Sequence, residues 1–470
     1  MIRVRRAAQG EAGALAALAL VAAGALIGAM LGRRARWSPT GWEPNRHTRI
    51  AQLNDSPPRR YYTGANLKRA VAIEDLRART HRRLPRFALE YLEGGAEDEA
   101  SLARERRAFA EWRFTPRQLV DVSQRSLSVE ILGRPAPAPL IVSPTGLNGV
   151  FRRHADIELA QGAAAAGVPF VQGTMSNERM EDVARAAPGL RHWWQLYVFG
   201  ADEVWQDLVR RADAAGCEAL VLTTNAQIFG NREWQTRTQA TPSRLTVGAA
   251  IDAALHPTWF AQTLGTNGMP RFANLLDYIP KAQHGLFESA DWVRAHQPKS
   301  LGWDTVAKIR ERWKKPFFLK GILNVGDVHR AIDAGVDGVV LGTHAGRQLD
   351  WSVAALDLLP EARAAAEGRI AVHISGGLRR GTDLLKSLAL GAEAVWVGHA
   401  PLYGVAAAGA AGVTRALQIL MKEADDAMGL LGVASLGELT PELLRRQAPR
   451  FAPMAGAAPA PWPDRLHRVR

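Results

Sequence analysis

Eight short apolar runs recur along the middle of the chain, separated by Ala-rich stretches with helical spacing. Fully apolar runs of this length are typical of strands buried on both faces, as in a parallel sheet. The intervening stretches, such as 156–167 and 327–335, predict helices. Eight strand–helix units over about 260 residues predict an α/β fold, a TIM (β/α)8 barrel, with a doubly wound open sheet as the alternative. The runs lie at 139–146, 168–173, 192–198, 219–225, 316–322, 338–344, 370–377 and 394–400.

Polar side chains stand at the carboxyl end of nearly every apolar run. In a barrel these ends converge on one face, which is where barrel active sites lie. Packing alone does not explain a polar or titratable residue at each of them. The residues are Thr145, Gln195, Tyr197, Thr223, Asn225, Lys320, His344, Ser375 and His399.

The interval between Arg232 and Lys320 is much longer than the other connections. It contains a variable loop around 240–305 with several aromatic residues and prolines, including Trp259, Phe260 and Tyr278. Long insertions in compact domains are usually lids or binding loops. We therefore expect this segment to cover the site, or to contact a membrane or a partner.

Motifs at the ends of the last four runs are specific in combination. They are LKGIL (319–323), GTHAGRQLD (342–350) and SGGLRRGTD (375–383), followed by LALGAEAVWVGHAPLYG (388–404). With FALEYLEGGAEDEASL, SPTGLNG, WQLYV and TTNAQIFGNREWQTR, they make residues 73–444 resemble the FMN-dependent α-hydroxy-acid oxidase/dehydrogenase family. That family includes glycolate oxidase, L-lactate dehydrogenase and mandelate dehydrogenase, and the motifs are most similar to those of mandelate dehydrogenase.

The resemblance implies a role for each matching residue. His344 would take a proton from a 2-hydroxy acid, Arg347 and Arg232 would hold its carboxylate, and Tyr91 and Tyr197 would hydrogen-bond to the carboxylate or to the hydroxyl. The implied cofactor is FMN, and no metal is implied. The implied flavin-binding residues are Lys320 near the N1–C2 carbonyl, Pro144, Thr145, Gly146, Gln195 and Thr223 along the ring, and Gly376, Gly377, Arg379 and Gly398 at the phosphate.

The residue types suit this chemistry independently of the resemblance. A histidine, with an ordinary pKa near ~6.5, can accept a proton near neutral pH. Arginine forks match a planar carboxylate better than lysine does. A fixed lysine stabilises the negative charge that develops on a reduced flavin. Glycines let backbone N–H groups approach a phosphate, and the loops after strands 7 and 8 are the usual phosphate site of a barrel.

The sequence departs from the family pattern around the implied base and flavin. Asn225 and Ser375 stand where the family has aspartates, His399 stands for an arginine, and Gly173 and Gly342 stand for serines. Loss of the carboxylate at 225 removes a favourable charge interaction with the histidine of roughly 1–3 kcal/mol. Two readings follow: an active enzyme, which we favour, or a weakened or inactive flavin barrel that serves as a structural or redox subunit of a membrane complex.

Charge is distributed very unevenly along the 470 residues. The formal net charge is +13, of which +9 lies in residues 1–70 and +4 in 441–470, so the barrel region is neutral. A basic nucleic-acid-binding surface on the barrel therefore has no support. The single cysteine, Cys217, excludes an intrachain disulfide and a cysteine-rich metal site.

Residues 12–31 form an uncharged apolar run flanked by three arginines on each side. Its length, about 20 residues, suffices to cross a bilayer, and it is long for a signal peptide. We expect a retained anchor, with a cleaved signal or a buried helix as alternatives. The expected division is anchor 1–32, basic linker 33–70, barrel 71–445 and irregular basic tail 446–470. Expected partners are membrane lipid, a quinone or membrane redox complex, oxygen as another acceptor, and further copies in a homotetramer, with the barrel in the cytoplasm.

Overall fold

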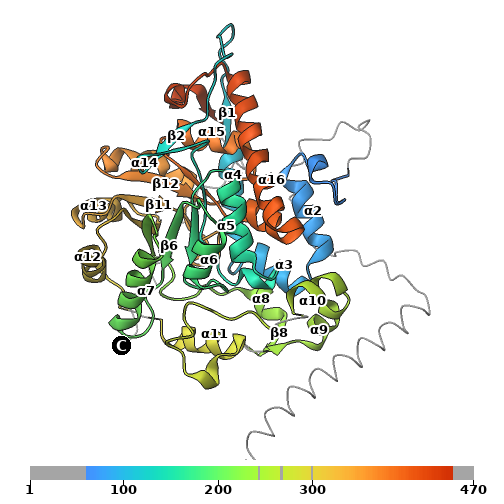
Figure 1. Cartoon of the computed structure of the whole chain (residues 1–470). Coiled ribbons are helices and arrows are strands. Elements are labelled where there is room, and N and C mark those ends of the chain that lie inside the picture. The colour runs from blue at the N-terminus through green and yellow to red at the C-terminus, as the bar shows by residue number, and fades with distance from the viewer. Residues whose placement is uncertain (1–59, 242–243, 265–267, 298–299, 448–470) are drawn as a thin grey trace, which may run out of the picture.

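Eight parallel strands close into a barrel in the computed structural model, which describes residues 60–241, 244–264, 268–297 and 300–447 (Figure 1). Each strand lies in one of the eight predicted runs, so the barrel prediction is confirmed. Closure is made by β13 beside β4, with Val395 opposite Leu140. The strands are β4 Leu140–Val142, β5 Phe170–Gly173, β6 His192–Leu196, β7 Ala219–Thr223, β10 Phe317–Ile322, β11 Gly338–Leu341, β12 Ala371–Ser375 and β13 Val395–Val397.

Helices pack around the outside of the barrel, as the apolar spacing of the intervening segments predicts. Their inward faces bury Ala, Val, Leu and Ile against the strands. They are α5 Ala155–Ala165, α6 Met180–Ala186, α7 Asp202–Ala214, α12 Trp303–Arg312, α13 Val325–Asp333, α14 Ala355–Ala366, α15 Gly381–Ala389 and α16 His399–Leu431. The predicted anchor, most of the predicted linker and most of the tail lie outside the described residues.

Aromatic side chains fill the interior of the barrel. Trp193 stacks on Phe318 at 5.4 Å between ring centroids and meets Trp396 edge-on at 5.9 Å. The hairpin of β2 Val129–Ile131 and β3 Arg134–Ala136 adds Ile131 and Ala136 to this cluster. A barrel packed in this way is a solid core, so a ligand has room only at the carboxyl ends of the strands.

Within the described residues, three α-helices precede the barrel: α2 Ile73–Arg83, α3 Arg86–Glu93 and α4 Ala100–Glu111. Glu93 accepts hydrogen bonds from Arg77 (2.7 and 3.0 Å) and from Tyr403 on α16 (2.8 Å). This joins α2, α3 and α16 and fixes α3, which carries Tyr91. Farther along, β1 Trp112–Phe114 pairs with β14 Leu444–Arg446, so the described part of the chain closes on itself.

The predicted variable loop contains helices of its own. These are α9 Val247–Ala254, α10 Pro257–Thr263 and α11 Leu286–Ala295, with β8 Gln239–Thr241 and β9 Arg244–Leu245 before them. Figure 1 shows them gathered beside α3 and α8 (Glu233–Arg237) at one end of the molecule. Trp259 of α10 is buried and donates to the Val150 carbonyl at 2.8 Å.

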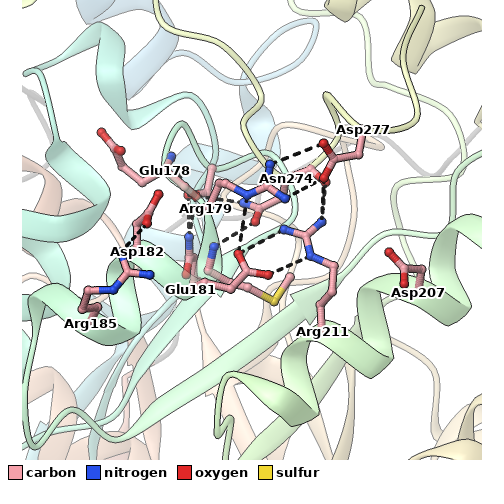
Figure 2. A network of polar contacts seen from close by, with 12 residues as sticks. Glu178, Arg179, Glu181, Asp182, Arg185, Asp207, Arg211, Asn274 and Asp277 are labelled. Atoms are coloured by element: carbon pink, nitrogen blue, oxygen red, sulfur yellow. Dashed lines mark hydrogen bonds and ion pairs between the residues drawn. The ribbon is translucent and has the colours of Figure 1, made fainter.

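A polar network attaches the segment before α11 to the barrel helices (Figure 2). Asp277 pairs with Arg179 at 2.6 Å, and the Asn274 side chain accepts the Met180 N–H at 2.9 Å. Arg211 on α7 donates to Glu181 at 2.8 Å and to the Asn274 carbonyl at 3.2 Å. The insertion is therefore held in place and does not simply trail over the surface.

Within the described residues, α16 is the one helix long and apolar enough to cross a membrane. Most of its apolar stretch is buried in the protein, where it packs against α5, α2 and α15. Ala408 and Gly409 leave helical geometry and kink it. This burial is typical of a core helix.

Candidate active site

A tight turn after β11 presents His344 at the mouth of the barrel. His344 and Ala345 both have positive φ, 59° and 58°, and the Thr343 hydroxyl accepts the Gly346 N–H at 2.9 Å. Two successive left-handed residues other than glycine are uncommon and cost backbone energy. Strain of this kind, held by surrounding hydrogen bonds, is typical of functional turns.

Three cations surround this turn. Lys320 lies near the carboxyl end of β10, Arg347 follows His344 in the same loop, and Arg232 is the N-cap residue of α8. Arg347 donates to the Tyr91 and Gly94 carbonyls, both at 2.7 Å, and Arg232 donates to Gln348 at 3.0 Å. Within the described ranges no carboxylate lies within ion-pair distance of any of the three. Cations held only by neutral groups form an anion-binding site.

Burial and mutual repulsion change the pKa values of these groups. The pKa of His344 is held well below its ordinary value, first by burial and then by Lys320, Arg232 and Arg347. Burial and Arg232 lower the pKa of Arg347 to about 9, and burial lowers that of Lys320 to about 8. The imidazole is therefore neutral near pH 7 and can accept a proton. An anion bound to the arginines would make that protonation easier.

Asn225 occupies the position from which a carboxylate was expected to orient the histidine. Its Nδ2 donates to the Gly342 carbonyl at 3.2 Å, whereas its buried Oδ1 has no partner among the described residues. His344 Nδ1 is likewise buried without a partner in that part of the chain. A Cβ on Gly321, at φ 103°, would overlap the Asn225 side chain, so a glycine is needed beside it.

The two predicted substrate-binding tyrosines lie close to the arginines. The Tyr91 hydroxyl donates to the Gly146 carbonyl at 3.0 Å, and the Arg347 guanidinium lies 4.9 Å from the centre of its ring. Burial raises the pKa of Tyr197, although Arg232 and Arg347 act in the opposite direction. Tyr197 is therefore protonated and available as a donor.

The residues predicted along the flavin ring end strands β4, β6 and β7. Thr223 is buried and pairs in register with Lys320 on the neighbouring strand. Gln195 accepts the Thr174 N–H at 3.2 Å, and its buried Nε2 has no partner within the described ranges. Pro144, Thr145 and Gly146 are half-buried in the loop after β4. An unpaired amide in a polar mouth fits a ligand with carbonyl and ring-nitrogen acceptors, as an isoalloxazine has.

The residues predicted at the phosphate form a cradle after β12 and β13. Gly376 and Gly377 have φ of 118° and 70°, values that glycine adopts readily. The Arg379 guanidinium donates to the Leu378 carbonyl at 3.1 Å and has no ion pair among the residues described. Gly398 is the N-cap of α16, so the free N–H groups of a helix start lie directly after β13. These features fit the phosphate of FMN.

One departure from the family pattern, His399, lies directly after Gly398 of the cradle. Burial and the nearby Arg379 hold the pKa of His399 well below its ordinary value, so it is uncharged near pH 7. It therefore does not replace the positive charge of the expected arginine. Arg380, the neighbour of Arg379, is exposed and pairs with Glu423, so it faces solvent.

An apolar cavity of about 610 Å³ adjoins this site. Tyr91, whose ring lies against the Arg347 guanidinium, is one of the residues that line the cavity. The cavity therefore lies next to the arginine site. It is formed between α3 and helices α9, α10 and α11 of the insertion. Its principal apolar walls are Phe87, Leu147, Trp259, Phe260, Leu286 and Phe287.

Sequence reasoning missed two polar residues of the site. Gln348 donates to the Asn225 and Ile228 carbonyls at 2.8 and 2.7 Å and accepts from Arg232, so it holds the loop after β7. Glu105, on α4, is buried and accepts from the Thr343 hydroxyl at 2.6 Å. Its only signal in the sequence is an acid on the buried face of a helix.

Comparison with known proteins decides the family. Residues 80–446 match the model of the FMN-dependent dehydrogenase family. The chain belongs to this family. It is 39% identical over 376 residues to (S)-mandelate dehydrogenase of Pseudomonas putida, covering 80% of this chain and 94% of that protein. It is 37% identical over 377 residues to L-lactate dehydrogenase of Caulobacter vibrioides, covering 80% and 98%.

Solved structures agree with this assignment. The crystal structure of the monotopic membrane protein (S)-mandelate dehydrogenase has a TM-score of 0.76 to this chain and 38% identity, covering 80% of this chain and 99% of that one. A mandelate oxidase has a TM-score of 0.64 at 34% identity, covering 78% and 96%. The chain is an FMN-dependent 2-hydroxy-acid dehydrogenase or oxidase, and the predicted family and cofactor are confirmed.

Proposed function

We propose that this enzyme oxidises an (S)-2-hydroxy acid with a bulky apolar, preferably aromatic, side chain to the 2-oxo acid. One observation carries the proposal: a neutral buried histidine among three cations without carboxylate partners in the described residues, next to a large apolar cavity. The cations suit the carboxylate of the substrate, and the cavity suits its side chain.

The proposed roles divide the reaction among the residues of the barrel mouth. Arg347 and Arg232 bind the substrate carboxylate, and Tyr197 donates a hydrogen bond to it or to the hydroxyl. His344 accepts the proton that the substrate loses, and its low pKa keeps it ready to do so. Tyr91 would have to leave Gly146 to donate to the substrate. FMN, when bound, accepts the two electrons.

The proposed flavin site uses residues at the carboxyl ends of several barrel strands. Lys320 would compensate negative charge near the N1–C2 carbonyl, and Gln195 would donate its free Nε2. The backbone of Gly376 and Gly377, Arg379 and the start of α16 at Gly398 would bind the phosphate. Pro144, Thr145, Gly146 and Thr223 would contact the ring.

A spectrum of the full-length protein tests the proposal. We expect flavin absorption that bleaches without oxygen when (S)-mandelate is added, with kcat/KM at least about tenfold higher than for L-lactate, because the aromatic ring is buried in the cavity. Equal rates with both acids would contradict the cavity assignment. A flavin that no 2-hydroxy acid reduces, or a colourless protein, would favour the inactive structural or redox subunit.

The terminal segments are proposed to place this enzyme on a membrane. The proposed division is anchor 1–32, linker 33–70, barrel 71–445 and tail 446–470, with electrons passed to a membrane quinone. The monotopic relative supports membrane association. So do Val247, Ile251 and Leu255, exposed at a spacing of four along α9 and its C-cap.

Extraction of isolated membranes tests this attachment. Apolar attachment resists high salt, which screens exposed charges, but not detergent. We therefore expect the full-length protein to stay in the membrane pellet in high salt and to be released by detergent. Release by salt alone would show that only the basic flanks bind, and would contradict the anchor.

A further inference from the structure

Glu105 places a carboxylate at the barrel mouth from a helix outside it. The residue lies on α4 and is 3% exposed. Its Oε1 accepts from the Thr343 hydroxyl at 2.6 Å, directly before His344. Its Oε2 faces Gly376, because a Cβ built on that glycine would overlap it. The carboxylate therefore sits between the ends of β11 and β12, where the flavin cradle begins.

Two nearby cations indicate which part of the proposed cofactor Glu105 would face. Lys320 and Arg379 both favour its ionised form, and burial opposes them, so its pKa rises to about 6. Within the described part of the chain, neither Lys320 nor Arg379 lies within ion-pair distance of Glu105. The carboxylate therefore remains available to a ligand. Lys320 is assigned to the ring carbonyl and Arg379 to the phosphate. The ribityl chain of FMN is what joins those two ends.

Ser375 makes this position significant. The family resemblance places there an aspartate that binds the ribityl chain, and a serine cannot supply its charge. We propose that Glu105 is a flavin-binding residue whose carboxylate accepts hydrogen bonds from the ribityl hydroxyls, in place of the carboxylate that position 375 lacks. Hydroxyl donors to an ionised carboxylate form strong hydrogen bonds. This inference rests on the proposed placement of FMN.

Binding of FMN to the full-length apoprotein, followed by quenching of flavin fluorescence, tests the role. Glu105→Gln keeps the shape and an acceptor for Thr343 but removes the charge. We expect the Kd for FMN to rise about tenfold. The midpoint potential of bound flavin should become more positive, because a negative charge near the reduced flavin is gone. Glu111→Gln, at the far end of the same helix, should leave both values unchanged.

The decisive experiment moves the carboxylate from position 105 to position 375. Ser375→Asp alone should weaken FMN binding about tenfold, because two carboxylates then share one site. The double variant E105Q/S375D should recover the wild-type Kd to within about threefold. The Tm of each apoprotein shows whether a variant is merely misfolded. Recovery of the Kd for FMN in the double variant, at a Tm equal to that of the single variants, supports the proposed role of Glu105.

Two results would overturn the inference alone: an unchanged Kd and potential in Glu105→Gln, or tighter binding by Ser375→Asp in the wild-type background. Wild-type protein that binds no FMN would instead overturn the proposed placement of FMN, and this inference with it.

Discussion

Replacing His344 by alanine is expected to lower kcat/KM for the 2-hydroxy acid by about 10³-fold while FMN stays bound, since a positioned general base contributes on the order of 10²–10⁴. The neutral imidazole can accept a proton, whereas the pKa values of Lys320 and Arg347, lowered to about 8 and about 9, leave both cations protonated near neutral pH. The measurement is the anaerobic rate of flavin bleaching beside the absorption spectrum. The exposed His329 on α13 provides the control, and His329→Ala should leave the rate unchanged.

The pH dependence follows from the sign of the His344 shift. Its pKa is lowered, so the free enzyme keeps a neutral imidazole through pH 6.5 and loses it only at more acidic pH. The acid limb of kcat/KM should therefore lie well below pH 6.5. A His344→Ala enzyme that retained a normal rate, or that kept the same acid limb, would contradict the assignment of the base.

A substitution at position 225 tests the same base. Asn225→Asp adds a negative charge, which raises the pKa of the neighbouring imidazole and stabilises its protonated form. We expect faster substrate oxidation, by about tenfold, and an acid limb moved to higher pH. A slower enzyme with an unmoved limb would mean that Asn225 no longer orients His344, and that its bond to the Gly342 carbonyl is its only role.

The barrel could be predicted because its signals are local. Each strand is buried on both faces, so it reads as an uninterrupted apolar run, and its polar end follows directly in sequence. Convergence of those ends is a property of the closed sheet, which explains why residues as distant as Tyr197 and His344 could be grouped from sequence before any geometry was known. The roles of individual residues came instead from family motifs.

What the sequence did not reveal depends on contacts between distant segments. Glu105 meets Thr343 across 238 positions, and no periodicity marks that pairing. The apolar cavity lies between α3 and helices of the insertion, so its walls are assembled only in the folded chain. Of those walls, Trp259 and Phe260 could be noticed as loop aromatics, but nothing in the sequence links them to Phe87.

Arg347→Lys is expected to lower kcat/KM by about 10²–10³-fold, mostly through KM, because removing one partner of a buried charged contact costs on the order of 2–5 kcal/mol. Arg347 is fully placed by its own hydrogen bonds: Nη1 donates to the Tyr91 and Gly94 carbonyls, and Nη2 donates to Gln235 at 3.3 Å. A lysine cannot bond to these groups and still present a planar fork to the substrate. Steady-state kinetics measures the split between KM and kcat.

Two comparisons separate substrate binding from a loss of structure at this position. Arg237→Lys, an exposed arginine of the nearby α8 paired with Glu233, should leave KM unchanged. The methyl ester of the substrate lacks the carboxylate charge, so it should inhibit the wild-type enzyme far more weakly than the 2-oxo acid product does. In Arg347→Lys that difference should shrink, because the group that distinguishes acid from ester has been removed. Undiminished preference for the acid would assign carboxylate binding to Arg232 alone and leave Arg347 the task of holding α3 against the barrel mouth.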